Sequence, residues 1–563
     1  MKFSLKSAMA LLTALLFITA GCAGNGAATP AQNTQAQEPA APAAPAAPER
    51  VTLEFLAPAP VTQFNDFEKV WEEVYKRTDS FLNVRVNYTL TTFDDVGQRI
   101  ALKLNAGEQL DGAFVAPWTN PSLVQMISQG LLTNLDSYFG NPQYPGLADC
   151  FPADFLEANS FLDSSGSKHV YGVPFASSIA STGSALYYRK DLAEKYGIGE
   201  ITSYETMIKY FDAILANEPG MYPFTISGAI DELAPGWLAS LYNEKSWTTD
   251  HNWKIGPLDG TNGIYVAVGD DGKAYASRQF VPEYDPVYRA MLKGPYKDND
   301  PLLFYNIARE WYTKGYFEKD ILNQKDPEGQ FVSGKAASFQ RGLDTYIGIA
   351  NRLEGSIAGA KIGAFITDRD IRLNTTKNAG SDFMAWNFLA VPTTSKNADR
   401  VMSLVNWIYE SQENHDLLEY GIEGEHWIAD GTDKFSYPEG SDPSTNYNFT
   451  GYILTWTPKY YRYASDIPDN IVTAMKKLGN IETVYKTYYA GFTFNPEPVQ
   501  TELTRMNDVV AYRRALGCGV PEDINAEIDR IQKLFDEAGF AKVAEEVERQ
   551  FNEFLKSNPY EGQ

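Results

Sequence analysis

Strand-like and helix-like segments alternate from residue 51 to about residue 130, and this alternation constrains the fold more than any other feature. The strand-like segments are residues 51–56, 82–91 and 113–116. The helix-like segments are residues 67–76, 96–106 and 122–129. Strands separated by helices pair in parallel, in a sheet that helices cover on both faces. Such a sheet binds ligands beyond the carboxyl ends of its strands, so we expect residues 58–64 and 117–121 at the edge of a binding cleft.

The rest of the chain continues the mixed pattern. We expect a hairpin at residues 269–273 and strands at 362–366 and 388–391. The expected helices are residues 203–217, 304–315, 399–410, 521–539 and 542–556. Ser203 is the expected N-cap of the first of these helices, and Gly315 ends the second. No internal repeat interrupts this pattern.

The first 22 residues have the pattern of a secretory signal. Lys2 and Lys6 precede an apolar run over residues 8–20, and Gly21-Cys22 follows. A cysteine directly after Ala-Gly is typical of a lipobox, in which the peptide is cut before Cys22 and the Cys22 thiol is diacylated. The alternative is a single membrane anchor, but the run is shorter than the roughly 20 residues that a bilayer requires. We therefore expect an exported protein, lipid-anchored on the outer side of the cell membrane.

Residues 23–50 are rich in Ala, Pro, Gln and Asn and end in AAPAAPAAP before Glu49. Proline keeps such a segment extended, so it is predicted to be a tether. The hydrophobic fraction of 44% predicts a packed core for the remainder. The net charge of −24 argues against nucleic acid as a partner, because nucleic acid requires basic patches. Besides Cys22 the chain has only Cys150 and Cys518, and their pairing stays open.

Several sequence segments match, in order, those of a known family. They are LKLNAGEQLDGAFV (102–115), SQGLLTNLDSYF (128–139), HVYGVPFASSIASTGSALYYRKDLAEKYGI (169–198), FVSGKAASF (331–339), FLAVPTTSKNADRVMSLVNWI (388–408) and YGIEGEHW (420–427). Each segment alone is a weak signal, but their order behind a lipobox is specific. The chain resembles family 1 extracellular solute-binding proteins, the lipoprotein receptors of bacterial ABC importers for oligosaccharides, and within them the larger Gram-positive subgroup.

The resemblance implies an α/β, two-lobed, periplasmic-binding-protein-like fold of type II. Each lobe would be a mostly parallel sheet flanked by helices, with hinge crossings at residues 187–188 and 388–391. The N-terminal lobe would comprise residues 51–186 and about 390–460, and the C-terminal lobe residues 187–389 and about 461–563. The lobes would close over an oligosaccharide and present it, unchanged, to an ABC transporter permease. The resemblance implies a monomer without a cofactor.

Sugars present apolar C–H faces and outward hydroxyl groups, so they bind to flat aromatic rings and planar polar side chains. Side chains of both kinds occur in loops expected on the cleft side. The candidates are Gln63, Trp118, Trp237, Gln340, Arg341, Trp386, Asn387, Glu423, His426 and Trp427. For each tryptophan the alternative is packing in the core, and for Arg341 it is an ordinary surface position.

Metal and catalytic sites have weaker support. Glu423, Glu425 and His426 cluster in a loop with two glycines, but no second histidine lies near, so we expect no metal there. Residues 298–300 (Asp-Asn-Asp) lack the glycine and distant glutamate of an EF-hand. His169 is interpreted as structural. No nucleotide-binding loop, zinc-protease motif or serine-hydrolase elbow occurs. A lipid-anchored glycosidase or lyase, with catalytic carboxylates, and a peptide-binding receptor stay as alternatives.

Overall fold

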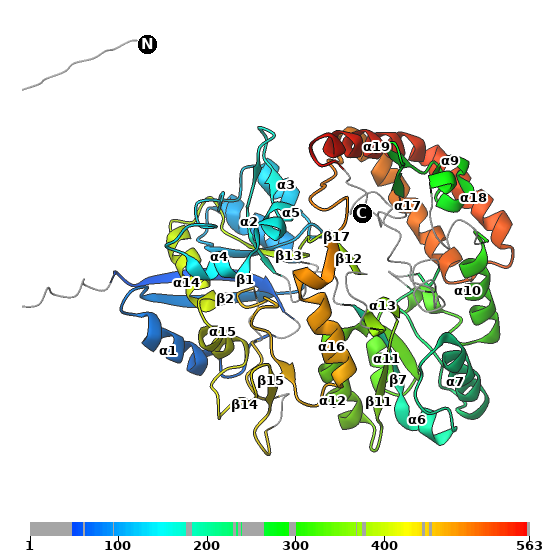
Figure 1. Ribbon diagram of the computed structural model, residues 1–563, viewed down its shortest axis with the longest axis horizontal. Helices are drawn as coiled ribbons and strands as arrows, with labels where there is room; N and C mark the ends of the chain where they lie inside the picture. The colour runs from blue at the N-terminus through cyan, green and yellow to red at the C-terminus, as the bar shows by residue number, and fades with distance from the viewer. Residues whose placement is uncertain are drawn as a thin grey trace, which may run out of the picture. The chain divides into compact units, whose positions relative to one another are not determined.

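The computed structural model describes most of the chain from residue 48 onward (Figure 1). The described ranges are residues 48–59, 62–93, 95–175, 183–228, 232–234, 238, 264–291, 300–367, 369–373, 379–441, 445–449 and 453–559. The lipobox, nearly all of the tether, Trp237, Asp298 and Asn299 lie outside them. Within these ranges, no helix combines the length and apolar character needed to cross a membrane.

The first sheet is built mainly from the alternating N-terminal segments. Its strands run in the order β2-β1-β3-β13-β6. They are β1 (Val51–Pro58), β2 (Val84–Thr91), β3 (Gly112–Val115), β6 (Val173–Phe175) and β13 (Asn387–Ala390). The helices between the first strands are α1 (Phe67–Thr78), α2 (Val96–Ala106) and α3 (Leu123–Ser128). The predicted strands and helices of this region are confirmed to within about two residues at each end.

The direction of β13 differs from that of the N-terminal strands. β1 pairs in parallel with β2 and β3, whereas β13 is antiparallel to both β3 and β6. Phe388 lies opposite Val115, so the start of β13 lies at the carboxyl end of β3. The first residues of β13 therefore share an edge of the sheet with the loop that follows β3.

The second sheet has the same arrangement around β7. Its order is β10-β7-β11, and β7 is antiparallel to both neighbours. The strands are β7 (Ser184–Arg189), β10 (Ser338–Gly342) and β11 (Ile362–Ile366). The two-lobed fold class holds, but the expectation of a mostly parallel sheet in each lobe is wrong for these three strands. In both sheets the antiparallel strand is the one that enters from the other lobe.

The residues expected at the hinge crossings lie inside strands of the two sheets, and their role as a hinge stays a prediction. Tyr187 and Tyr188 lie within β7, and Phe388 to Ala390 lie within β13. Backbone inside a paired strand is held on both sides by ladder hydrogen bonds. Residues 382–386, which precede β13, form no helix or strand.

Helices cover both sides of the second sheet. Ser203 caps α7 (Tyr204–Asn217) through the Thr206 amide, as predicted. Gly315, at φ 80°, ends α10 (Leu303–Lys314) where only glycine is unstrained. The predicted hairpin is β8 (Val266–Val268) and β9 (Ala274–Ala276). The remaining elements here are α6 (Lys190–Lys195), α9 (Pro286–Met291), α11 (Pro327–Val332), α12 (Tyr346–Ser356) and α13 (Arg369–Arg372).

The apolar core consists mainly of two clusters, which the second sheet separates. Tyr187 belongs to the cluster that continues into the first sheet, and its neighbour Tyr188 belongs to the other. Adjacent residues of a strand point to opposite faces, which explains this division. Cys150 packs against the first cluster and Cys518 lies in the second, and they form no disulfide with each other.

Further elements of the first lobe surround its sheet. They are α4 (Pro145–Cys150), α5 (Ala153–Ala158), β4 (Phe161–Leu162), β5 (Lys168–His169), α14 (Ala398–Tyr409), α15 (Gln412–Glu419), β14 (Ile428–Asp430), β15 (Lys434–Ser436) and β16 (Tyr463–Ala464). The helix predicted at 399–410 corresponds to α14. Its residues Val401, Met402, Leu404 and Val405 belong to the first core cluster.

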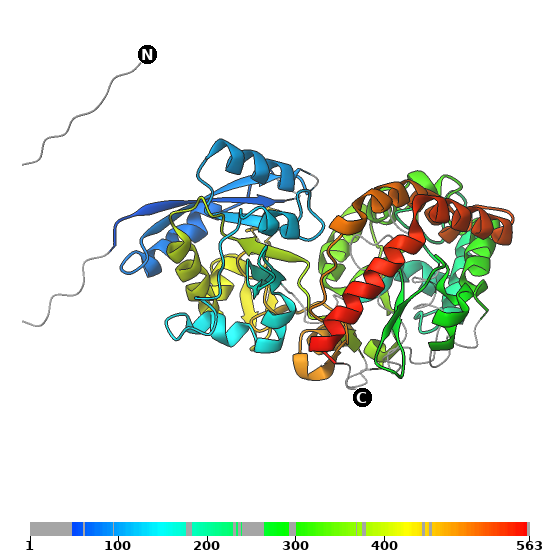
Figure 2. The same ribbon diagram turned by 90° about the horizontal axis from the view of Figure 1, so that it is seen from above.

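The C-terminal part is mostly helical, in orange and red in Figure 2. It comprises α16 (Asp469–Leu478), β17 (Val484–Lys486), α17 (Gln500–Gly517), α18 (Ile524–Ala538) and α19 (Phe540–Ser557). The last two helices were predicted, with Gly539 between them at φ 100°. β17 pairs in parallel with β12 (Ala379–Ser381), just before the passage to β13. Phe535, Phe540 and Phe551 extend the second core cluster.

Candidate functional site

Trp118 and Asn387 meet at the edge of the first sheet. The Trp118 Nε1–H group donates a hydrogen bond to Asn387 Oδ1 over 3.1 Å. Trp118 follows β3, and Asn387 begins β13, which runs in the opposite direction. Two residues 269 positions apart are thus joined because antiparallel pairing brings the end of one strand to the start of the other.

The aromatic rings at this edge are exposed to solvent. Trp386 is 63% exposed and Trp118 is 43% exposed, although large aromatic side chains are usually well buried. Phe93, after β2, is 44% exposed, and its ring centroid lies 6.4 Å from that of Trp118. The buried ring of Phe114 contacts the Trp118 ring edge to face, with the two ring centroids 5.8 Å apart. The edge therefore presents apolar ring surface beside an amide.

Gln63 lies in the loop after β1, which ends at the same edge of the sheet. Its side chain is exposed, so its amide is open to solvent. A contact between Gln63 and a solute stays a prediction.

Gln340 and Arg341 lie in β10 of the second sheet. Gln340 Nε2 donates to Ser184 Oγ over 2.5 Å, and Ser184 Oγ lies 2.9 Å from Thr367 Oγ1. Gln340 Oε1 is buried and has no hydrogen-bond partner among the described residues. A buried acceptor without a donor costs free energy, so it is suited to accept a hydrogen bond from a solute. Arg341 is exposed, with Nε 4.0 Å from Glu328 Oε2.

The loop at residues 421–427 is arranged differently. Trp427 is 4% exposed, and its Nε1–H group donates to the Gly421 carbonyl over 3.0 Å. The guanidinium of Arg462 lies 5.2 Å from the Trp427 ring centroid. Glu423, in contrast, is exposed. The indole of Trp427 is thus already packed and hydrogen-bonded within the protein.

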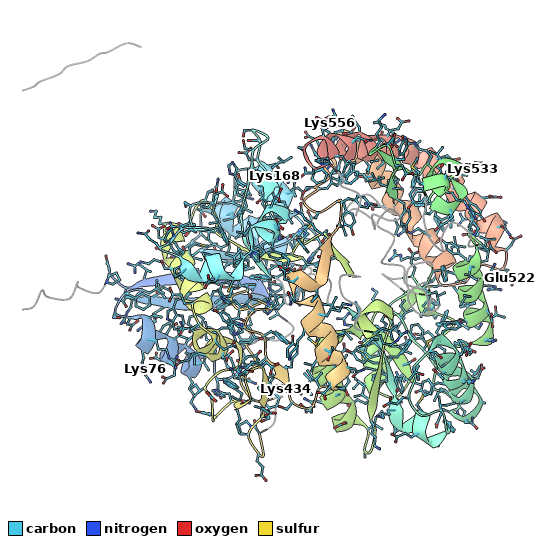
Figure 3. The ribbon with its side chains drawn as sticks, viewed as in Figure 1. Lys76, Lys168, Lys434, Glu522, Lys533 and Lys556 are labelled. Carbon is cyan, nitrogen blue, oxygen red and sulfur yellow. The ribbon has the colours of Figure 1, made fainter. Side chains whose placement is uncertain are left out.

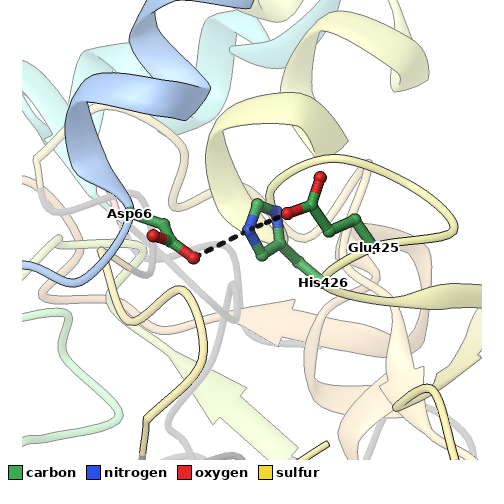
Figure 4. A group of neighbouring side chains, drawn as sticks. All are labelled: Asp66, Glu425 and His426. Carbon is green, nitrogen blue, oxygen red and sulfur yellow. Dashed lines mark hydrogen bonds and ion pairs between the residues drawn. The ribbon is translucent and has the colours of Figure 1, made fainter.

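His426 is buried and links this loop to the start of α1 (Figure 4). Its Nδ1 accepts a hydrogen bond from the Ile422 amide over 2.8 Å, and its Nε2 lies 3.2 Å from Asp66 Oδ2. An amide can only donate, so neutral His426 carries its proton on Nε2, and this N–H group donates a hydrogen bond to Asp66 Oδ2. His426 therefore joins two loops at the carboxyl side of the first sheet.

Asp66, Glu425 and His426 have the composition of a metal site, and their ligand atoms lie within 4.8 Å of one another. However, the Nε2 lone pair that a metal requires is protonated in this tautomer. Lys69 also forms a hydrogen-bonded ion pair with Glu425. The hydrogen bond from Lys69 to Glu425 raises the pKa of Lys69. The three side chains therefore fit a hydrogen-bonded contact between the 421–427 loop and the start of α1 rather than a cation site.

The predicted residues thus fall into separate places. Trp118 is hydrogen-bonded to Asn387, which directly follows Trp386 in the chain. Gln340 and Arg341 lie in β10 of the second sheet, and His426 joins the 421–427 loop to the start of α1. The sequence did not indicate Phe93 and Ser184 as site residues, although they lie beside Trp118 and Gln340 in the structure. Phe93 follows a predicted strand in a polar loop, the same signal that indicated Trp118, whereas nothing in the sequence distinguishes Ser184.

Comparison with known proteins identifies the family. The family model described as "Bacterial extracellular solute-binding protein" matches residues 62–422, more than half of the chain. The chain belongs to this family. As a member of an extracellular family, this solute-binding protein is exported. A second model, "Domain of unknown function (DUF3502)", matches residues 477–556.

A curated relative is a carbohydrate ABC transporter substrate-binding protein of Streptococcus pneumoniae. It is 22% identical over 480 residues, covering 82% of this solute-binding protein and 83% of the relative. The N-glycan transport solute binding protein NgtS of the same species has a similar structure, with a TM-score of 0.65 and 17% identity over 90% of this chain and 99% of NgtS. Its complex with Man5GlcNAc gives a TM-score of 0.58 with 18% identity, over 91% and 100% of the two chains.

A second protein with a similar fold is FusA of Streptococcus pneumoniae, solved in complex with kestose. Its TM-score is 0.56 with 14% identity, over 90% of this chain and 100% of FusA. At these identities the solved structures establish the two-lobed, type II fold of the solute-binding protein.

Proposed function

We propose that the protein captures a carbohydrate, specifically an oligosaccharide, and delivers it to the permease of an ABC transporter. The observation that carries the proposal is the exposed edge formed by Trp118, Trp386 and Asn387. Exposed indole rings bind the C–H faces of sugars, and a neighbouring amide binds their hydroxyl groups. The named relatives are receptors for carbohydrates, which supports the same class of solute here.

Capture depends on contacts from both lobes. A solute shifts the balance between open and closed forms only by binding one form more tightly. Trp118, Trp386, Asn387 and Gln63 offer contacts from the first lobe, and Gln340 and Arg341 offer them from the second. The unpartnered Gln340 Oε1 supports this assignment. The other predicted contacts are Trp237, Glu423, His426 and Trp427. The support for the last three is weaker, because Trp427 and His426 are already packed and hydrogen-bonded within the protein.

The proposal extends to membrane anchoring, oligomeric state and the absence of catalysis. Cys22 carries the lipid, and residues 23–50 act as the tether. The predicted lobe boundaries are kept, except that Trp386 and Asn387 are assigned to the first lobe because β13 pairs within the first sheet. The protein acts as a monomer, without a cofactor and without cleaving its solute. The family supports a binding role, and the exposed edge offers apolar rings and an amide, which bind without reacting.

A thermal-shift screen tests the proposal. The mature protein is heated with Man5GlcNAc, Man1GlcNAc, kestose, malto- and xylo-oligosaccharides, and with a mixture of short peptides. A solute that binds only the folded state stabilises it by about 2.7 kcal/mol at 100 times its Kd, so the melting temperature rises. We expect a rise with at least one oligosaccharide and none with peptides.

Product analysis completes the test. After incubation, chromatography is expected to recover each oligosaccharide intact. A rise with peptides alone would favour the peptide receptor, and shortened sugars would favour the glycosidase or lyase. Metabolic labelling with palmitate is expected to label the wild type and not Cys22→Ala, and equal labelling would contradict the lipid anchor.

A further inference from the structure

The segment that presents Trp386 and Asn387 has little regular structure of its own. Between β12 and β13 the chain runs through residues 382–386 without a helix or strand. Phe383 has a φ of 58°, a conformation that is uncommon for a bulky residue. Such a conformation persists only where the surroundings hold it in place. The contacts that hold this segment therefore determine where Trp386 lies.

Asn159, at the end of α5, holds the segment from one side. Its side chain is fully buried. Nδ2 donates to the carbonyls of Phe155 and Phe383, each over 2.7 Å, and Oδ1 accepts from the Ala385 amide over 2.7 Å. Because the Ala385 amide can only donate, the amide orientation of Asn159 is determined. Asn159 thus fixes the residue directly before Trp386.

The domain of unknown function holds the segment from the other side. β17 pairs with β12 in parallel, with Ser381 opposite Lys486. The Thr487 amide donates to the Ser381 carbonyl over 2.9 Å, and Thr487 Oγ1 donates to the same carbonyl over 3.2 Å. The first residues of the passage are thus tied to the C-terminal part of the chain.

Two lysines connect residues 484–491 of the C-terminal domain with α5 and β5 of the first lobe. Lys486 Nζ, beside β12, lies 3.3 Å from Glu157 Oε2 on α5. Lys168 lies on the first lobe (Figure 3). Its Nζ donates to the Gly491 carbonyl over 3.2 Å and lies 5.8 Å from the centroid of the Phe554 ring in α19. Residues 484–491 therefore touch α5 and β5 of the first lobe, while the helices that follow belong to the second core cluster.

We propose that residues 484–491 of the domain of unknown function, acting with Asn159, are positioning elements for the solute-contacting pair Trp386 and Asn387. This inference rests on the proposed function for the role of the pair, but not for the positioning itself. The C-terminal domain thereby holds the passage between the lobes, so that the two side chains face the solute in one orientation.

Hydrogen exchange in the absence of solute tests the positioning. The double variant Lys168→Met/Lys486→Met removes both lysine contacts but leaves the apolar part of each side chain. The matched control is Lys542→Met/Lys556→Met, which removes two exposed ion pairs, with Glu502 and Glu553, inside the C-terminal helices. Exposed contacts of this kind each contribute little to global stability, so both variants are expected to stay folded.

We expect amides of residues 379–390 to exchange about two- to fivefold faster in Lys168→Met/Lys486→Met, because local opening becomes easier. The control is expected to show no change there, and Lys168→Arg/Lys486→Arg is expected to restore the wild-type rate. Unchanged exchange in the first variant would overturn the inference. So would faster exchange throughout the chain, because that indicates general destabilisation.

A titration with Man5GlcNAc, or with kestose if Man5GlcNAc gives no thermal shift, separates this inference from the proposed function. With exchange altered as expected, the variant is expected to bind the sugar more weakly than the control does. Altered exchange with no sugar bound by the wild type would reject the carbohydrate assignment alone. Normal exchange with normal sugar binding would reject the positioning alone.

Discussion

Trp386 and Trp427 stand in two regions that look alike in the sequence and differ in the structure. Both follow a loop and have polar neighbours that suit a sugar. Trp386 is 63% exposed beside Asn387, whereas Trp427 is 4% exposed and donates its N–H group to the Gly421 carbonyl. An aromatic ring is therefore available to a solute only where its own packing leaves a face uncovered.

The largest expected effect is on stability, from Trp427→Ala. Removing a buried tryptophan leaves a cavity, so we expect the free energy of unfolding to fall by about 3–5 kcal/mol. Urea denaturation measures this change, with Trp386→Ala as the control that changes stability little. A small loss of stability together with a large loss of sugar affinity would place Trp427 in the binding site.

Asn159→Ala is expected to cost about 1–3 kcal/mol of stability, because the Phe383 carbonyl and the Ala385 amide lose their buried partner. The control is Asn217→Ala, which removes an exposed asparagine that bonds one carbonyl at the end of α7. Denaturation of the two variants side by side measures the difference. Equal stability would show that Asn159 does not hold the passage before Trp386.

Asn387→Ala is expected to reduce sugar affinity about two- to fivefold, corresponding to one net hydrogen bond of about 0.5–1 kcal/mol. Trp118 loses its acceptor and becomes free to turn. Asn387→Asp keeps an acceptor and is expected to retain most of the affinity. Calorimetric titration of both variants checks this, and an unchanged affinity for Asn387→Ala would remove the pair from the site.

The smallest effect concerns pH. The hydrogen bond with Glu425 raises the pKa of Lys69 above its usual 10.5. A raised lysine pKa stabilises the fold below the unfolded pKa, and this stabilisation is lost as pH rises through the folded value. The stability difference between wild type and Lys69→Met, measured by denaturation across this alkaline range, is therefore expected to shrink as Lys69 loses its proton. Trp118, Trp386 and Asn387 do not titrate, so a pH dependence of the same shape in sugar affinity would contradict the separation of the two regions.

The sequence predicted the local elements well, because these depend on neighbouring residues. α2 has the predicted bounds, and Ser203 caps α7 as predicted. α17 was missed, since polar residues surround its few buried positions, which are Leu503, Met506, Val509, Leu516 and Gly517. Its burial comes from packing with α18 and α19, which a local pattern does not contain.

Relations between distant residues were the hardest to predict. The antiparallel direction of β7 and β13 depends on the path between the lobes, not on the strands themselves. Asn159 bonds Phe383 across 224 positions, and a single asparagine at the end of a helix has no distinctive pattern. Similarly, Trp118 and Trp427 could be told apart only by their burial.

Binding at the exposed edge of the first sheet is tested most directly by the affinity of Trp386→Ala for the oligosaccharide that gives the largest thermal shift, measured by titration calorimetry. We expect the Kd to rise about tenfold or more, equivalent to about 1.4 kcal/mol, while the melting temperature stays within about 2 °C of the wild type. A variant that binds this sugar as tightly as the wild type would contradict the placement of the solute at this edge.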